Sequence, residues 1–490
     1  MNELSDKAGK RITLDKIPQS LIDEWAECGF NAVWLMGVWT TGKTGIQIAR
    51  DHEGLRETYT KVLPDFRDED VIGSPYAIAA YTISRTLGGP TALQVLRKRL
   101  AAKGMGLVLD FVPNHTARDY KWLFDHPEYY INGKDGDENS NAELFFKSKT
   151  KKDERVIAFG RDPYFPGWTD TAQLNPLHQG ARKAMIDTLH TIAKQCDGIR
   201  CDMAMLLLNT VFQKTWGEQS KPEDGEPLQE EFWCDAIQSV HQQNPSFVFL
   251  AEAYWNLEWP LQQLGFTYTY DKTLYDRMLR EGASSVRDHL KAETIYQMRS
   301  ARFLENHDEP RVAQILPNES WQYAAAVITA TVPGMLLLHE GQMEGRKVKI
   351  PVQLGRRPHE DISPQTKSFY KKLLRCLQHD VIKNGTWELL PLRAGWHDNH
   401  TYQNIISFCW RKESSFRLIV VNYAPLNSQA YVELDAECLA GLSGTSFELR
   451  DLMSPAVFVR DRHGLQTKGM YFDLAGYGLH IFEVKTATRS

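Results

Sequence analysis

The 490-residue chain carries 57 Lys and Arg against 62 Asp and Glu, which gives a formal net charge of -5 and a sequence pI near 6.3. This balance argues against binding to nucleic acid or to an anionic membrane surface, and it suits a neutral substrate. With 42% hydrophobic residues the chain can build a large core, which excludes wholesale disorder, and its length suits an enlarged barrel plus a smaller module.

The seven cysteines are odd in number and show no spacing typical of a disulfide framework or a zinc site, so we expect reduced thiols. The N-terminus is polar, without the apolar region of a secretion signal, and no uncharged run is long enough to span a membrane. We therefore predict a cytoplasmic protein.

The first hundred or so residues predict two helices, a buried strand and a long excursion. A helix is expected from Pro18 to Trp25 with Ser20 as its N-cap, and a buried strand follows at 32–38. Upstream of that helix only 12–14 has strand character. Residues 40–73 are predicted to be a loop excursion with room for a short helix, and a second helix then leads to the next strand.

Four later segments are apolar, strand-like runs that end in polar side chains. They cover residues 106–115, 196–204, 247–252 and 302–308. Continuous apolar runs are typical of strands buried on both faces of a parallel sheet. Acids, histidines and an arginine at the C-terminal ends of such strands are the pattern of a barrel active site. For the segment with Arg200 and Asp202 alone, a structural ion pair is an equally good interpretation.

In this order the four segments resemble the conserved regions of the alpha-amylase family of retaining glycoside hydrolases. The resemblance implies an α/β fold in which a (β/α)8 barrel of the TIM type occupies residues 1–384. The strand at 32–38 matches the second barrel strand of the family, so the first of the eight strands is expected to be missing. It also implies a short inserted domain after strand 3, at residues 116–176, and a C-terminal all-β sandwich at residues 385–490. Short alternating strands beyond Gly385 favour the β module independently.

The resemblance also implies the catalytic roles. Asp202 matches the nucleophile, Glu252 the acid/base, and Asp308 the third carboxylate, which holds the distorted sugar. Arg200, two residues before Asp202 on the same strand face, is expected to orient it and keep it ionised. Because Glu252 follows an apolar run, we expect burial to push its pKa away from that of Asp202.

Three further residues are implied to bind the same sugar. His115 and His307 match the two histidines that hydrogen-bond it, and Tyr76 matches the tyrosine that stacks on it. The tyrosine element departs from the family pattern, because Ala77 and Ala80 replace two acids, which weakens any claim to the terminal-sugar clamp of exo-acting members.

Other departures bear on metal binding and on the leaving group. Asn114 matches a calcium ligand, but Gln173 stands where many members have an acid, and Ca²⁺ needs several oxygen donors. Residues 203–206 read Met-Ala-Met-Leu in place of Ala-x-Lys-His, which predicts a more apolar leaving-group side. No cofactor and no metal ligand are assigned, and calcium stays an open alternative.

The predicted function is therefore a retaining alpha-glucoside hydrolase that acts on alpha-glucans or maltooligosaccharides through a glycosyl-aspartate intermediate. Two alternatives stay open: an alpha-glucosyl transferase that uses the same triad, and a catalytically silent family member that acts as a binding protein. The expected partner is an oligo- or polysaccharide, with neither nucleic acid nor membrane. A product time course on maltoheptaose with and without a free acceptor sugar would separate these readings.

Overall fold

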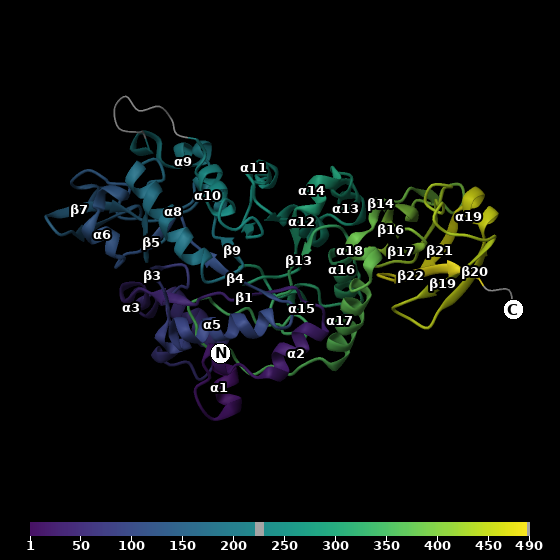
Figure 1. Cartoon of the computed structure of the whole chain (residues 1–490), viewed down its shortest axis with the longest axis horizontal. Helices are drawn as coiled ribbons and strands as arrows, with labels where there is room; N and C mark the ends of the chain where they lie inside the picture. Colours follow the sequence, from purple (N-terminus) through teal and green to yellow (C-terminus); the bar gives the residue numbers. More distant parts are fainter. Residues whose placement is uncertain (221–229, 488–490) are drawn as a thin grey trace. The chain divides into compact units, whose positions relative to one another are not determined.

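The computed structural model, drawn in Figure 1, describes residues 1–220 and 230–487. The chain divides into two compact units. The first unit is formed by Met1–Tyr270 and Ile350–His359, and the second by Asp271–Lys349 and Glu360–Ser490.

A parallel sheet with helices between its strands forms the centre of the first unit. Within this unit the strands of the sheet run in the order β1 (Ala32–Trp34), β4 (Gly106–Phe111), β9 (Gly198–Cys201), β10 (Val248–Ala251) and β11 (Tyr268–Tyr270). The principal helices are α2 (Gln19–Glu27), α5 (Gly89–Ala101), α8 (Gln179–Ala193), α10 (Phe232–His241) and α11 (Glu258–Gln263). Leu107, Ile199 and Phe249 are fully buried between strands and helices, and α8 packs beside α10 (Figure 1). Strands predicted from apolar runs thus pair in parallel.

The N-terminal part of the unit contains more helix than the sequence predicted. Before β1 lie only the helix α1 (Asn2–Ala8), the 3-10 turn η1 (Leu14–Lys16) and α2, so within the described residues no strand precedes Ala32, as predicted. Helix α2 begins at Gln19 with Pro18 in the N-cap position, so the prediction of Ser20 as the cap is wrong. The predicted loop at 40–73 is more regular than expected, because it holds α3 (Lys43–Asp51) and α4 (Glu53–Val62).

The segment after β4 forms a small substructure. Strand β5 (His115–Ala117) pairs antiparallel with β8 (Thr171–Gln173), and β6 (Phe145–Lys149) forms a hairpin with β7 (Glu154–Ala158). A local apolar cluster that includes Ile131 supports this hairpin. The limits 116–176 for an inserted domain stay a prediction.

The second unit contains a shorter parallel pair and two antiparallel sheets. Strand β12 (Ser300–Arg302) pairs in parallel with β13 (Met335–Leu336), and the principal helices are α12 (Lys272–Arg280), α13 (Ala283–Leu290), α16 (Glu319–Thr331) and α17 (Pro364–Leu377). The six-stranded sheet has the order β14 (Thr386–Leu389), β16 (Ile405–Lys412), β17 (Ser415–Asn422), β22 (Leu479–Thr486), β19 (Ser446–Asp451), β20 (Val457–Asp461). The three-stranded sheet has the order β15 (Leu392–Ala394), β18 (Ser428–Val432), β21 (Met470–Leu474).

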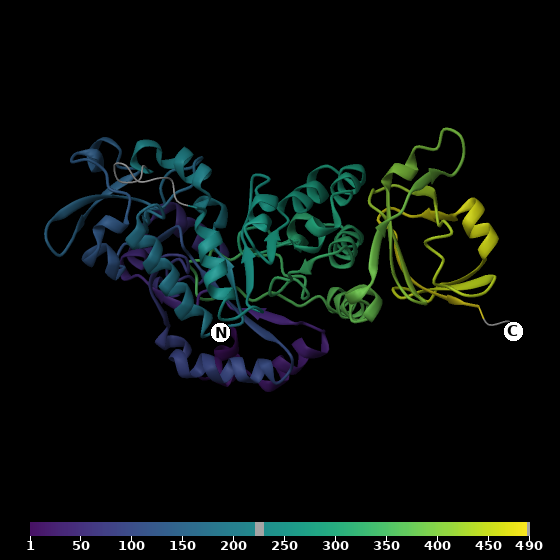
Figure 2. The same cartoon turned by 45° about the horizontal axis from the view of Figure 1, so that its top comes forward.

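The two antiparallel sheets face each other (Figure 2) and share a core to which Leu418 and Phe482 contribute from one sheet and Val432 and Phe472 from the other. The predicted α/β class with C-terminal β-sheets is confirmed. The boundary at residue 385 stays a prediction.

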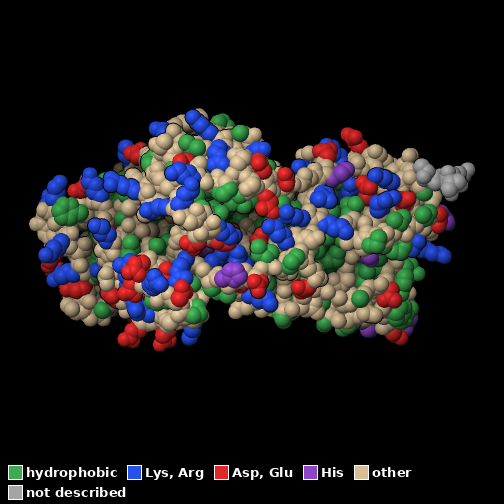
Figure 3. Space-filling view, turned by 90° about the horizontal axis from the view of Figure 1, so that it is seen from below, with side chains coloured by type: hydrophobic (Ala, Val, Ile, Leu, Met, Phe, Trp, Pro, Cys, Tyr) green, Lys and Arg blue, Asp and Glu red, His purple; other side chains and the backbone are tan. Residues whose placement is uncertain are grey.

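The surface agrees with the balanced composition. Acidic and basic side chains are interspersed over the face shown in Figure 3. Among the described residues, none of the helices combines the length and apolar character that crossing a bilayer requires.

A buried ionic cluster stabilises the start of the second unit. Asp271 is 1% exposed, and its Oδ2 lies 2.9 Å from Nε2 of His289 and 3.1 Å from Nε of Arg302, while its Oδ1 accepts the N–H of Leu274 at the start of α12. Burial alone would raise the pKa of Asp271, but Arg302 and then His289 hold it below its ordinary value. The ionised carboxylate therefore stabilises the folded state.

Replacing Asp271 with Asn should lower the free energy of unfolding by about 3 kcal/mol, because it leaves the buried Arg302 without its counter-charge. Because the pKa of Asp271 is lowered in the folded state, the wild type should be more stable than the Asn variant above the ordinary pKa of Asp. This difference in the free energy of unfolding should disappear as pH falls through the folded-state pKa. Urea unfolding at a series of acidic pH values measures this difference in the free energy of unfolding. Asp276→Asn, at a partly exposed Lys272 pair, is the matched control. Equal losses of stability in the two variants would contradict the account. So would a stability difference between the wild type and Asp271→Asn that does not narrow in acid.

Candidate active site

The strand register brings the two predicted catalytic acids to the same edge of the sheet. Strand β9 lies between β4 and β10, and Cys201 is paired with Phe111 on one side and Ala251 on the other. Asp202 follows Cys201 and donates its N–H to the Phe111 carbonyl at 2.9 Å, and Glu252 follows Ala251 and donates its N–H to the Cys201 carbonyl at 3.0 Å. The acids therefore leave neighbouring strands at the same level.

A single guanidinium group contacts both acids. Arg200 is fully buried; its Nη1 lies 2.6 Å from Oδ1 of Asp202, and its Nη2 lies 2.8 Å from Oε2 of Glu252. Asp110, directly opposite Arg200 on β4, has its Oδ1 3.8 Å from the same Nη1. The prediction assigned Arg200 to Asp202 alone, and the structure shows it shared between the acids.

Three aromatic rings surround this guanidinium. Its Cζ lies 5.1 Å from the ring centroid of Tyr76, 5.4 Å from that of Trp34 and 5.7 Å from that of Tyr270. The electron-rich ring faces favour a cation that has lost its water. Burial acts to lower the pKa of Arg200, but Glu252, the two tyrosines and Asp202 hold it well above its ordinary value. Arg200 is therefore a permanent positive charge.

Glu252 receives further hydrogen bonds. Its Oε2 accepts the backbone N–H of Met203 at 2.6 Å, and its Oε1 accepts the Tyr254 hydroxyl at 2.9 Å. Met203 adopts a left-handed backbone with φ 44°, which is costly for a residue with a Cβ and is typical of functional sites. The sequence-based prediction rested only on burial by the preceding apolar run, whereas the structure adds two hydrogen-bond donors and the Arg200 guanidinium to this carboxylate.

His115 and Tyr76 complete the group in the first unit. His115 is 3% exposed, lies edge-on to Trp168 with ring centroids 5.1 Å apart, and its ring donates to the backbone carbonyl of Tyr76. Burial lowers the pKa of His115 to about 3, against a smaller opposing effect of that bond. The imidazole is therefore neutral near pH 7, able to accept or donate a hydrogen bond without adding charge.

The other two predicted residues lie in the second unit, after β12. His307 is buried, and its Nε2 lies 3.0 Å from Oδ2 of Asp308, whose side chain is 42% exposed. The Asn306 side chain accepts the N–H of Asp308 at 2.8 Å and fixes the turn. The structure thus joins Asp202, Glu252, Arg200, His115 and Tyr76 in one contact network and pairs His307 with Asp308 in another.

The apolar leaving-group side predicted from residues 203–206 is wrong for two of them. Met205 is fully buried and Leu206 is 2% exposed, so both belong to the core of the first unit. The exposed apolar surface near the site is aromatic: Trp255, 38% exposed, lies edge-on to Tyr164, 57% exposed, with ring centroids 5.0 Å apart. Trp255 follows Glu252 by three residues and is held in a left-handed backbone with φ 63°.

The contacts of Asn114 do not suit calcium. Its side-chain oxygen accepts Nε2 of Gln173 at 3.0 Å, and its Nδ2 donates to Oε1 of Gln173 at 3.3 Å. Both residues are at most 2% exposed, and the two amides satisfy each other. Because a carboxamide presents an N–H where a carboxylate would present a second oxygen, this pair does not fit a Ca²⁺ ligand set.

Trp34 and Tyr270 were not predicted from the sequence as partners of Arg200. Trp34 ends β1, within the strand predicted at 32–38, and Tyr270 ends β11. Their position at strand ends was the available signal, but an aromatic residue in a strand is usually core.

Two acids at the ends of adjacent parallel strands, bridged by one buried arginine, define a glycoside hydrolase site of the barrel type. Residues 22–372 match the model of the alpha-amylase catalytic domain, and the chain belongs to the alpha-amylase family of glycoside hydrolases.

Known relatives agree with this assignment. The chain is 25% identical over 254 residues to the alpha-amylase MalA of Haloarcula japonica, a match that spans 50% of this chain and about a third, 32%, of the relative. A maltogenic alpha-amylase of Thermotoga neapolitana has the same fold, with a TM-score of 0.65, 20% identity and coverage of 95% of this chain and 93% of that one. The alpha-amylase of Geobacillus thermoleovorans, solved with acarbose, gives a TM-score of 0.66, 16% identity and coverage of 97% and 93%.

Activity should be insensitive to EGTA, because Asn114 and Gln173 satisfy each other and supply no calcium site. The measurement compares initial rates on maltoheptaose before and after dialysis against EGTA, with a calcium-dependent amylase treated in parallel as control. A loss of activity that Ca²⁺ restores and other divalent ions do not would overturn this prediction.

Proposed function

We propose that the protein is a retaining alpha-glucoside hydrolase that acts on alpha-glucans or maltooligosaccharides through a glycosyl-aspartate intermediate. The observation that carries the proposal is the contact of one guanidinium with both Asp202 and Glu252. Retaining glycosidases hold their two carboxyl groups about 5 Å apart, whereas inverting enzymes leave room for a water between them. A shared guanidinium favours the close spacing.

In the first step, Asp202 attacks the anomeric carbon while the glycosidic bond breaks and Glu252 gives its proton to the leaving oxygen. Arg200 keeps Asp202 anionic and aims its carboxylate, and it stays protonated throughout. The Tyr254 hydroxyl, which can donate or accept, is placed to follow the change in protonation of Glu252.

In the second step, Glu252 takes a proton from a water molecule as the oxygen attacks the anomeric carbon, and the bond to Asp202 breaks. Both carboxyl groups then return to their starting states. A sugar hydroxyl in place of water would give transfer by the same steps.

A neutral sugar chain suits the surroundings of these acids. His115 is uncharged and can hydrogen-bond hydroxyl groups, and Tyr76 offers a ring face. The exposed pair of Trp255 and Tyr164 gives further flat apolar surface, which suits stacking on the faces of sugar rings. We assign Asp308 and His307 to the hydroxyls of the sugar being cleaved, as the family resemblance implies.

The Glu252→Gln variant tests the roles directly. Without a general acid, hydrolysis of maltoheptaose should fall by about 10²- to 10⁴-fold. An alpha-glucosyl fluoride, whose leaving group needs little protonation, should still react with Asp202, and the adduct should accumulate because no base activates water.

Peptide mass spectrometry after exposure to the fluoride is the measurement, and Asp202→Asn, exposed in the same way, is the matched control that should carry no adduct. An adduct on another residue, or undiminished hydrolysis by Glu252→Gln, would refute the assignment.

A further inference from the structure

The C-terminal β-sheets bring two cysteines and a glutamate together, although they are far apart in the sequence. Glu388 on β14 lies directly opposite Cys409 on β16 in the antiparallel register. Cys438 reaches them from the turn after β18, where its N–H donates to Oδ1 of Asp435 at 2.8 Å. One ligand atom of each of the three residues lies within 4.8 Å of the others, and within the described part of the chain this is the only such group of His, Cys, Asp or Glu side chains.

The two thiols are positioned by direct contacts. Cys409 is fully buried and Cys438 is 3% exposed. The Sγ atoms of Cys409 and Cys438 lie within 4.8 Å of each other, and Sγ of Cys438 donates to Oε2 of Glu388 at 3.6 Å. Three side chains that could serve as metal ligands therefore already lie close together.

We propose that Cys409, Cys438 and Glu388 form a binding site for a thiophilic divalent cation of the Zn²⁺ class. Two thiolates select such ions over Ca²⁺ and Mg²⁺, which prefer oxygen ligands. In a tetrahedral site with Zn–S bonds of about 2.3 Å, the two sulfurs lie about 3.8 Å apart, so the convergence needs little movement. Binding replaces the two thiol protons with the metal and releases them to solvent.

Arg411 balances the charge of this site. Its Nη2 lies 3.0 Å from Oε2 of Glu388 and 3.3 Å from Oε1 of Glu437. Two thiolates and a carboxylate carry one negative charge more than a divalent ion neutralises, and Arg411 supplies the missing positive charge. Its contact with Oε2 also positions the Glu388 carboxylate, which is the role of outer partners that orient metal ligands.

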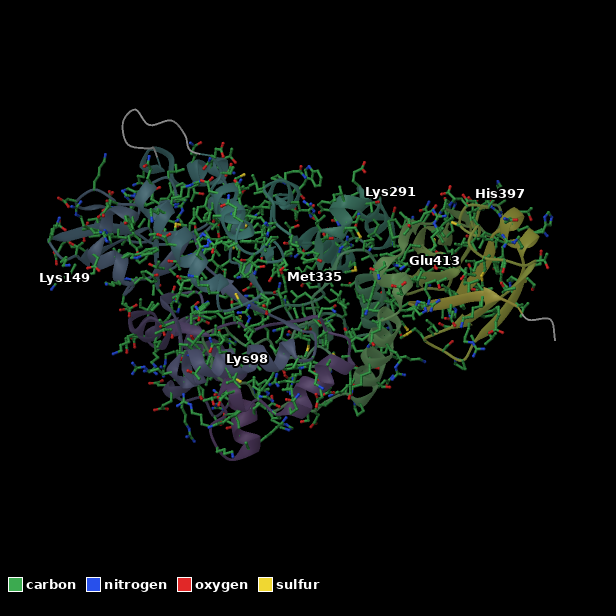
Figure 4. The ribbon with its side chains drawn as sticks, in the orientation of Figure 1. Lys98, Lys149, Lys291, Met335, His397 and Glu413 are labelled. Atoms are coloured by element: carbon green, nitrogen blue, oxygen red, sulfur yellow. The ribbon has the colours of Figure 1, made fainter. Side chains whose placement is uncertain are left out.

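A cavity borders the proposed site at one of its three ligands, Cys438. A cavity of about 560 Å³ is lined by Cys438, Glu437 and Arg411, and by Glu413 at the turn between β16 and β17, which is labelled in Figure 4. A site with three protein ligands completed by solvent is an accepted Zn²⁺ geometry. This site lies in the β-sheets of the second unit and is independent of the proposed glycosidase chemistry.

The test uses the full chain, reduced and stripped of metal, titrated with Zn²⁺ against a chromophoric chelator and separately with Co²⁺. We expect one equivalent of Zn²⁺ to bind, and Co²⁺ to give a thiolate charge-transfer band. Cys409→Ala, Cys438→Ser and Glu388→Gln should each weaken Zn²⁺ binding at least tenfold. Cys376→Ser, at the thiol on α17, is the matched control and should bind as the wild type does.

Thermal unfolding separates a variant that has lost the metal site from one that fails to fold. Zn²⁺ should raise the Tm of the wild type and of Cys376→Ser, and should leave the Tm of Cys409→Ala and Cys438→Ser unchanged. Three results would each overturn the proposal: no stoichiometric Zn²⁺ binding to the reduced protein, binding that survives loss of both cysteines, or Zn²⁺ bound without a thiolate band in the Co²⁺ form.

Discussion

The first unit depends on the neutralisation of one fully buried positive charge. A guanidinium cannot be taken out of water without several kcal/mol of compensation, and Arg200 obtains it from Asp202 and Glu252 and from the rings around it. The same compensation fixes where the two carboxylates point. The same contacts therefore stabilise the charge of Arg200 and orient the two catalytic acids. Removal of any group that contacts Arg200 disturbs the rest of the arrangement.

The register of the parallel sheet determines where Arg200, Asp202 and Glu252 lie. Gly198 begins β9 opposite Val248, and a Cβ at Gly198 would lie 2.9 Å from both the Cβ and the carbonyl oxygen of Val248, so only glycine allows β10 to approach this closely. Two residues later the same register places Arg200 beside Leu250. A shift of one residue would turn Arg200 to the opposite face of the sheet. Backbone packing at the start of the strands thus determines the chemistry at their ends.

The sequence predicted those features that depend on order along the chain. Apolar runs that end in acids identified β4, β9 and β10, and a motif resemblance supplied the candidate residues. Contacts between residues far apart in the sequence could not be predicted from it. An aromatic residue such as Trp34 is typical of a core position, and only the structure shows that it contacts Arg200. The amide pair of Asn114 and Gln173 was visible only as a departure from an acid. The cysteine spacing gave no sign of the cluster around Cys409, because its members meet only through sheet pairing.

The central claim is that Arg200 holds Asp202 and Glu252 close enough for a double displacement. The anomer of the first product tests it most directly, measured by proton NMR during early hydrolysis of maltoheptaose, before mutarotation mixes the two forms. The account predicts that the new reducing end appears as the alpha-anomer and converts slowly to the beta-anomer. Initial release of the beta-anomer would show that water attacks directly, and that the bridged pair does not work as nucleophile and acid/base.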